Sequence, residues 1–139
     1  MSFYKCSHFK IQELVDPDTY GRFGEQAWMF FNPAFLRSAD AVRDHFGVRC
    51  TINNWLWGGN RKWSGLRPRL CSIGAGYSQH RFGNAGDILL DGVRAEDARK
   101  EILEHKDDIF TEVMCLEDEV DWLHMDCRNI PDRIRLVRP

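Results

Sequence analysis

The sequence predicts an α+β fold in a single domain, residues 1–139, with an antiparallel sheet packed under helices. Two observations predict it. Helical patterns occur early in the chain and strand patterns mostly late. A chain of 139 residues with 43% hydrophobic side chains also buries one core of ordinary size, so a second folded module is not expected.

The N-terminal third supplies a short packed segment and a helix. Residues 8–13 resemble a segment that packs onto the domain, and the Asp-Pro-Asp run at 16–18 breaks it. Asn32 is a good N-cap residue, Pro33 suits a first helical turn, and apolar side chains then recur at helical spacing up to Gly47. This pattern predicts an amphipathic helix that begins at Pro33 and ends before Gly47.

The middle of the chain is predicted to contain a short strand and a long loop. Residues 48–53 are typical of a strand, whereas residues 54–76 are rich in Gly, Trp and Arg and have no regular period. Long loops inside a compact domain usually serve a site, so we expect this loop to form a wall of the active cleft. Its tryptophans at 55, 57 and 63 fit two interpretations equally, an aromatic platform for substrate and a buried anchor for the loop.

The remaining elements are one helix and several strands. The pattern predicts a helix over residues 95–105, with apolar side chains on one face. Strands are predicted at 88–90, 111–116, 122–127 and 133–137, separated by an acidic turn at 117–119 and by Asn-Ile-Pro at 129–131.

Composition excludes several classes of protein. The net charge of -2 gives no general attraction to nucleic acid. No run approaches the roughly 18 apolar residues of a membrane span, and the first residues lack the zones of a signal peptide, so we expect synthesis to end in the cytoplasm. The five cysteines are odd in number and show no paired spacing, which predicts free, mostly buried thiols. We expect a monomer.

Two histidines and a carboxylate form the candidate metal site. His80 and Asp87 lie seven residues apart with small residues between them, a spacing that suits a loop leading into a strand. His124 lies in a strand pattern in which Trp122, His124 and Asp126 share one face. Three such ligands plus a water are the set of a catalytic zinc site.

The same residues carry a family resemblance. Ser78, His80, Gly83, Ala85 and Asp87 stand at the spacing found in the zinc D-Ala-D-Ala metallopeptidase family, which includes bacterial carboxypeptidases, D,D-dipeptidases and phage endolysins. Downstream, an acidic residue three positions before the last histidine and a tryptophan between them resemble the family pattern. Upstream, the Ser-Gly-Leu-Arg run at 64–67 resembles a further family segment.

The resemblance implies a role for each residue. His80, Asp87 and His124 would bind Zn²⁺, Asp121 would be the general base, and Arg67 would bind the substrate carbonyl or carboxylate. Ser78 and Trp122 would contribute to the substrate site, with Ser78 also shaping the ligand loop. The implied fold is that of the D-Ala-D-Ala metallopeptidases and hedgehog-like domains, with the zinc site on the sheet.

The identity of the base stays open at this point. Strict strand alternation puts Asp121 on the face opposite His124, and a turn or bulge at 119–121 would bring it back. If the strand is regular, Asp126 becomes a partner of the ligand or a rival base. Glu119 is a third alternative.

By resemblance, the expected substrate is the peptidoglycan stem peptide and the expected reaction is hydrolysis of one of its peptide bonds. An endolysin of a phage or prophage would gather in the cytoplasm and reach the cell wall after release. Two alternatives remain: a D,D-carboxypeptidase or dipeptidase that acts on free precursors, and a non-catalytic phage structural or wall-binding protein of the same fold.

Overall fold

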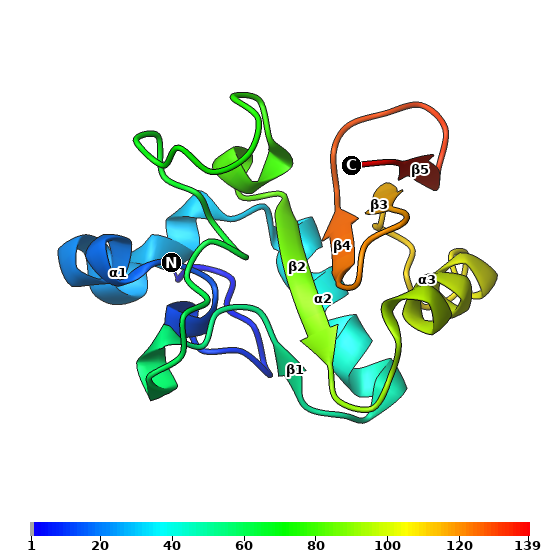
Figure 1. Cartoon of the computed structure of the whole chain (residues 1–139), viewed down its shortest axis with the longest axis horizontal. Helices are drawn as coiled ribbons and strands as arrows, with labels where there is room; N and C mark the ends of the chain where they lie inside the picture. Colours follow the sequence, from blue (N-terminus) through cyan, green and yellow to red (C-terminus); the bar gives the residue numbers. More distant parts are fainter. Residues whose placement is uncertain (1) are drawn as a thin grey trace.

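A mixed five-stranded sheet and three α-helices make up the domain in the computed structural model, which describes residues 2–139 (Figure 1). The predicted α+β class is therefore confirmed. The helices are α1 (Pro17–Phe23), α2 (Pro33–Phe46) and α3 (Ala95–Glu104). The strands are β1 (Cys50–Thr51), β2 (Ala85–Leu90), β3 (Cys115–Glu117), β4 (Leu123–Asp126) and β5 (Arg135–Val137).

Helix α2 forms where the sequence predicts it. The side chain of Asn32 accepts a hydrogen bond from the backbone N–H of Ala34 at 3.0 Å, and Pro33 opens the first turn. Gly47 ends the helix in the left-handed conformation with φ of 64°. The buried face of α2 includes Phe35, Leu36, Ala39 and Val42.

Phe35 packs directly on the sheet. A β-carbon added to Gly86 of β2 would lie 2.7 Å from the Cζ atom of Phe35, so only glycine permits this approach. Because successive side chains of a strand point to opposite faces, the next residue, Asp87, points away from α2. The helix and core therefore cover one face of β2, and the other face is free to carry polar groups.

The sheet is mixed, which corrects the prediction of an antiparallel one. Its strand order is β1-β2-β4-β3-β5, and β5 pairs with β3 in parallel. After β4 the chain reverses direction, but it passes to the far side of β3 before it pairs. Since β3 is antiparallel to β4, a strand that reverses from β4 and lies beyond β3 must run parallel to β3.

Several further boundaries differ from the predictions. Strand β1 covers only Cys50–Thr51 of the predicted 48–53, β2 begins at Ala85 instead of 88, and β5 begins at Arg135 instead of 133. The break at 16–18 also starts a helix, because the side chain of Asp16 accepts from the backbone N–H groups of Asp18 and Thr19 at 3.1 Å each and caps α1. The strand predicted at 111–116 begins only at Cys115 and continues to Glu117. The predicted helix at 95–105 is confirmed as α3.

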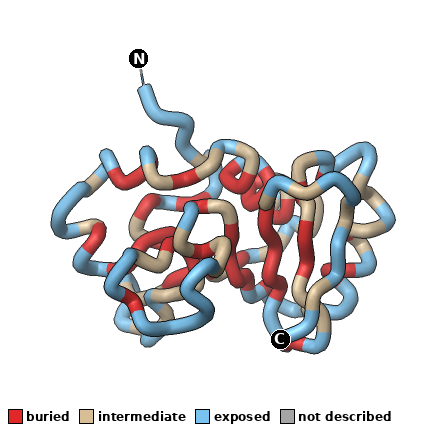
Figure 2. Tube along the Cα trace, turned by 90° about the horizontal axis from the view of Figure 1, so that it is seen from above, coloured by how far each residue is buried: buried red, intermediate tan, exposed pale blue. Residues whose placement is uncertain are grey.

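Buried residues concentrate on neighbouring strands and on the helix behind them, and exposed residues lie in the peripheral loops (Figure 2). All five cysteines are free, and Cys50, Cys71, Cys115 and Cys127 are buried, as predicted. Across residues 2–139, no helix combines the length and apolarity needed to cross a membrane.

Candidate metal centre

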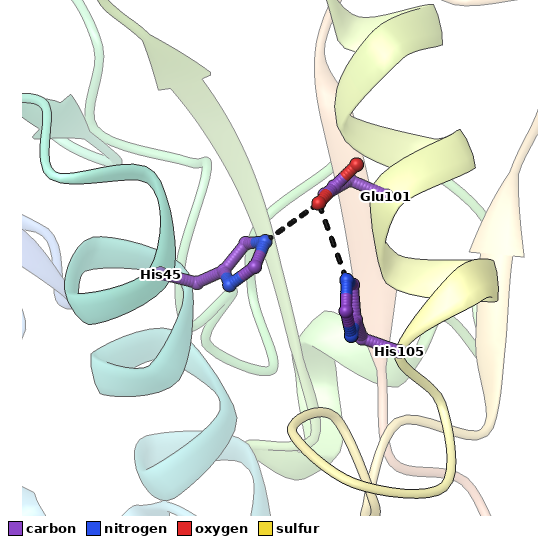
Figure 3. Close-up of side chains that lie close together, drawn as sticks. All are labelled: His45, Glu101 and His105. Carbon is purple, nitrogen blue, oxygen red and sulfur yellow. Dashed lines mark hydrogen bonds and ion pairs between the residues drawn. The ribbon is translucent and has the colours of Figure 1, made fainter.

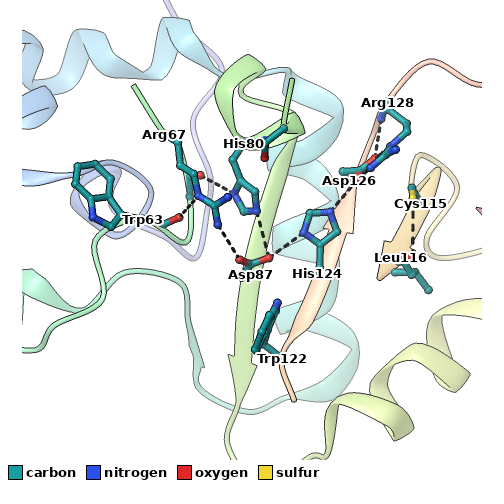
Figure 4. Close-up of polar contacts among 12 residues, drawn as sticks. Trp63, Arg67, His80, Asp87, Cys115, Leu116, Trp122, His124, Asp126 and Arg128 are labelled. Atoms are coloured by element: carbon teal, nitrogen blue, oxygen red, sulfur yellow. Dashed lines mark hydrogen bonds and ion pairs between the residues drawn. The ribbon is translucent and has the colours of Figure 1, made fainter. Parts of the chain in front are cut away.

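Among residues 2–139, two groups of three side chains bring potential metal-ligand atoms within 4.8 Å of one another. One group is His45, Glu101 and His105, which lies partly exposed between α2 and α3 (Figure 3). The other is the predicted triad, His80, Asp87 and His124, which is buried (Figure 4). The sequence pattern therefore identified three residues that meet in space.

The triad is assembled by a turn and two paired strands. His80 lies in a short 3-10 helix, Gln79–Phe82, whose first turn is capped by the side chain of Ser78 through a 3.3 Å hydrogen bond from the His80 backbone N–H. Gly83 then turns the chain toward β2 with φ of 70°, and a β-carbon at that position would overlap the carbonyl oxygen of Phe30. The predicted role of Ser78 in shaping the ligand loop agrees with this contact.

Asp87 and His124 are opposite each other in the antiparallel pairing of β2 with β4. Side chains of opposite residues emerge on the same face of a sheet, about 4.5–5.5 Å apart at their β-carbons. The side chain of His80 reaches that face from the 3-10 helix that precedes β2, and its ring centroid lies 5.2 Å from that of His124. All three side chains are buried.

One carboxylate oxygen is the centre of the triad. Oδ1 of Asp87 lies 2.8 Å from Nδ1 of His124 and 3.3 Å from Nε2 of His80. These three atoms are a carboxylate oxygen and two imidazole nitrogens, which is the donor set of many catalytic zinc sites. The residues therefore fit a divalent zinc ion chemically.

Each histidine is oriented by an outer partner. Nδ1 of His80 donates to the carbonyl oxygen of Gly65 at 2.8 Å, which leaves Nε2 directed at the triad. Nε2 of His124 lies 2.9 Å from Oδ2 of Asp126, which leaves Nδ1 directed at the triad. Metal-binding histidines usually have such a partner on the second nitrogen, because it fixes the tautomer and the direction of the ring.

Asp126 is held in turn by Arg128. The guanidinium of Arg128 donates from Nε to Oδ1 at 2.8 Å and from Nη2 to Oδ2 at 2.7 Å. Asp126 is fully buried and does not line the cavity described below. Of the two roles that the sequence left open for Asp126, the geometry favours that of a partner which orients His124.

Arg67 reaches the triad from the long loop. Its Nη2 lies 3.4 Å from Oδ2 of Asp87, and its Nε donates to the carbonyl oxygen of Trp63 at 2.8 Å. The backbone of this segment is tied to the site, because Arg67 N donates to His80 O and Asp87 N donates to Ser64 O, at 3.1 Å and 2.8 Å. The loop therefore lines the cavity at the triad, as predicted, and its part in an active cleft stays a prediction.

Of the two roles predicted for the loop tryptophans, the contacts favour the anchor over the substrate platform. Trp55 is half-buried and donates from Nε1 to the carbonyl oxygen of Val15 at 2.8 Å, which anchors the loop. Trp57 is exposed and lies in a separate hollow with Glu13 and Arg43, away from the triad. None of the three tryptophans of this loop is among the described residues that line the cavity at the triad.

The charges of the triad depend on these contacts. Burial by itself would raise the pKa of Asp87, but hydrogen bonds from His124 and His80 hold that pKa well below its usual range. Burial by itself would lower the pKa of His124, but hydrogen bonds to Asp126 and Asp87 raise it to about 9. Asp87 is therefore ionised at neutral pH, as a metal ligand must be.

A cavity of about 630 Å³ opens over the triad. Its wall includes the segment 74–79, the predicted substrate residues Ser78 and Trp122, and the guanidinium groups of Arg67, Arg128 and Arg138. This volume is in the range of small-molecule and peptide sites. Three arginines in one wall favour an anionic ligand.

The predicted base, Asp121, is not brought to the triad. It is exposed and faces a different hollow, which is also lined by Glu119, by Arg94 at the N-cap of α3 and by Arg99 within α3. The expected bend is present, since Glu119 has φ of 61°, but it does not change the alternation of the strand that follows. Trp122, in the bend before β4, and His124 both line the cavity at the triad, whereas Asp121 lines the other hollow.

Glu117 is a cavity residue that the sequence reasoning missed. Leu116 of β3 is opposite Met125 of β4, so the next step of the same register brings Glu117 opposite His124. Besides Asp87, Glu117 is the one side-chain carboxylate among the described residues that line the cavity. Alternation from Cys115 would have found it if the strand had been predicted at 115–117, whereas the acidic run at 117–119 was interpreted as a turn.

No family model matches the chain, and comparisons with curated proteins and with solved structures gave no match. The likeness to the D-Ala-D-Ala metallopeptidases therefore stays a prediction from the motif residues.

Proposed function

We propose that this protein is a zinc-dependent metallopeptidase that hydrolyses a peptide bond in the peptidoglycan stem peptide. The observation that carries the proposal is the convergence of His80 Nε2, Asp87 Oδ1 and His124 Nδ1 at the floor of an open cavity. Buried ligands with oriented outer partners, beneath a cavity that admits substrate, are the arrangement of a catalytic metal site and not of a closed structural one.

Zinc bound by the triad would supply a Lewis acid and a water molecule whose pKa is near 7. The protein would hold the ion through His80, Asp87 and His124, with Gly65 and Asp126 fixing the two imidazole rings. Asp87 would use Oδ1 for this purpose, since its Oδ2 faces Arg67.

Proton transfer is assigned to Glu117. General-base catalysis needs a carboxylate within reach of the attacking water and of the leaving amine. Glu117 lines the cavity on the strand next to His124, whereas Asp121 faces another hollow. We therefore propose Glu117 as the group that takes the proton and returns it to the amine, in place of Asp121.

Substrate binding is assigned to the arginines of the cavity. Arg67 holds Asp87 and is partly exposed to the cavity, so its remaining donors can bind the carbonyl oxygen that becomes negatively charged. Arg138 is exposed at the cavity wall and can bind a carboxylate of the stem peptide. The endolysin role, in a phage or prophage, is supported by the motif resemblance alone.

The test combines metal analysis with an amine-release assay on purified peptidoglycan. Zinc-loaded protein should release new amino groups, chelation should stop the release, and zinc should restore it. The His80→Ala variant should bind no zinc in the cavity and should release no amino groups from peptidoglycan. Arg69→Ala is a suitable control, because Arg69 does not line the cavity.

Other outcomes redirect the proposal. If the protein cleaves free D-Ala-D-Ala but does not clear a suspension of intact walls, its substrates are free precursors. Sedimentation with walls and no amine release by fully zinc-loaded protein would refute the peptidase and favour a wall-binding protein.

A further inference from the structure

The second histidine cluster lies apart from the cavity, where α2 ends and α3 ends (Figure 3). His45 is the penultimate residue of α2, and Glu101 and His105 stand four positions apart at the end of α3. Residues at this spacing project from the same face of a helix. Three potential ligands from two helices therefore face one another.

The contacts repeat the pattern of the buried triad. Oε1 of Glu101 lies 2.9 Å from Nε2 of His45 and 3.4 Å from Nε2 of His105. The two imidazole rings have centroids 5.0 Å apart. As at Asp87, one carboxylate oxygen is approached by one nitrogen from each of two histidines.

Both imidazole rings of the cluster also contact residues outside it. Nδ1 of His105 lies 3.3 Å and 3.2 Å from the two carboxylate oxygens of Asp108, so its Nε2 is directed at Glu101. The ring of His45 meets those of Phe46 and Phe110 edge to face, at centroid distances of 5.1 Å and 5.5 Å. A carboxylate behind a histidine and a packed ring are the supports that metal ligands need.

We propose that His45, Glu101 and His105 form a second site for a divalent transition-metal ion of the zinc class, which joins the end of α2 to α3. Two imidazoles and one carboxylate suit zinc, and also nickel, copper and cobalt. The side chains are 20%, 37% and 30% exposed, so an ion can enter from solvent and water can complete its coordination.

The expected effect of this site is on the stability of the fold. It is formed by other residues than those that line the catalytic cavity, and no residue is shared between them. An ion that binds the folded chain but not the unfolded one raises stability by mass action. The second ion should therefore raise the melting temperature without taking part in the reaction.

The experiment is a Zn²⁺ titration of the full chain by calorimetry, with thermal unfolding beside it. The wild type should bind two ions, and His105→Gln should bind one. The five histidines include a matched control, because His8 is exposed and belongs to neither cluster. His8→Gln should still bind two. His105→Gln should also lose the rise of several degrees in melting temperature that the second ion gives the wild type.

Two further variants keep the outcome interpretable. Asp108→Asn preserves all three ligands and should weaken the second site about 10-fold to 100-fold, since it removes only the outer partner. His124→Gln disables the buried triad, so one zinc bound by that variant, and lost on adding His105→Gln, reports the second site alone.

The result that would overturn the proposal is a His124→Gln variant that binds no zinc, or one whose bound zinc persists when His105→Gln or Glu101→Gln is added. The proposal does not depend on the peptidase. Zinc bound by His124→Gln would support it even if no peptidoglycan were cleaved.

Discussion

Oδ1 of Asp87 lies 2.8 Å from Nδ1 of His124, and the two residues stand opposite each other on β2 and β4. The strand pairing thus delivers two of the three candidate ligands together, and only His80 comes from a turn. Because the pairing belongs to the core of the sheet, the position of the site is fixed by the fold itself. Variants of these residues and of their supports can test each part of this arrangement.

Asp87→Asn should abolish zinc binding in the cavity and peptide hydrolysis while the chain still folds. Asparagine has nearly the same shape, but it lacks the negative charge that both histidines approach. The loss of zinc affinity should exceed the roughly 10-fold to 100-fold effect typical of outer partners. Zinc titration measures the affinity, and far-ultraviolet circular dichroism shows whether the variant folds. A variant that binds zinc in the cavity normally would exclude Asp87 as a ligand.

Asp126→Asn should weaken zinc binding without abolishing it. The carboxylate of Asp126 contacts Nε2 of His124 at 2.9 Å, so its loss affects the orientation and basicity of the ring but removes no ligand. We expect affinity to fall by about 10-fold to 100-fold. Competition with a chromogenic chelator gives the affinity, and complete loss of binding would make Asp126 a ligand.

Glu117→Gln should reduce the turnover number by about 100-fold to 10,000-fold with zinc content unchanged, because it removes the proposed general base. Asp121→Asn should leave turnover close to that of the wild type, since Asp121 faces another hollow. Amine-release kinetics measured as a function of pH distinguish the two candidate bases. The acidic limb of the rate profile should vanish only in Glu117→Gln. The reverse result would restore Asp121 as the base.

Metal-free protein should lose stability as the pH rises from neutral through about 9. Hydrogen bonds to Asp126 and Asp87 raise the pKa of His124 to about 9 in the folded chain, above its ordinary value. A raised pKa means that the folded state binds the proton more tightly, so the stabilisation is complete below the ordinary pKa of about 6.5 and is lost through the raised one. Melting temperatures of chelator-treated protein across this range test the slope, which should be much smaller in His124→Gln.

Gly83→Ala should destabilise the fold by about 1–3 kcal/mol, because φ of 70° is unfavourable for alanine and its β-carbon would overlap the carbonyl oxygen of Phe30. Gly21→Ala in α1 is the control, since nothing lies within 4 Å of its added β-carbon. That change should be neutral or stabilise the protein by about 0.4–1 kcal/mol. Urea unfolding of both variants gives the difference, and equal stabilities would contradict the tight turn.

The parts that the sequence predicted well are those that local chemistry determines. Helix α2 has its cap, its proline and its terminal glycine within the segment itself, so its bounds followed from the residues. The residues of the triad were found through motif spacing, although nothing local required them to meet. Free, buried cysteines followed from their number and spacing.

The parts that were missed depend on partners far away in the chain. The parallel pairing of β5 is set by which side of β3 the chain reaches, and no local pattern records that choice. Glu117 lines the cavity because β3 pairs with β4, and Asp121, in the bend before β4, lines a different hollow. Strand register therefore decided which acidic residue accompanies the triad.

The close approach of Gly86 to Phe35 links the alignment of β2 to the proposed metal site. Gly86 must face α2 for the core to close, and its neighbour Asp87 must then face the histidines. A slip of β2 by one residue would put a carboxylate against the Phe35 ring and leave a glycine among the ligands. At the proposed zinc site, only chains with the native strand alignment would bind the ion, so the zinc-loaded fraction of a preparation would count the correctly folded molecules.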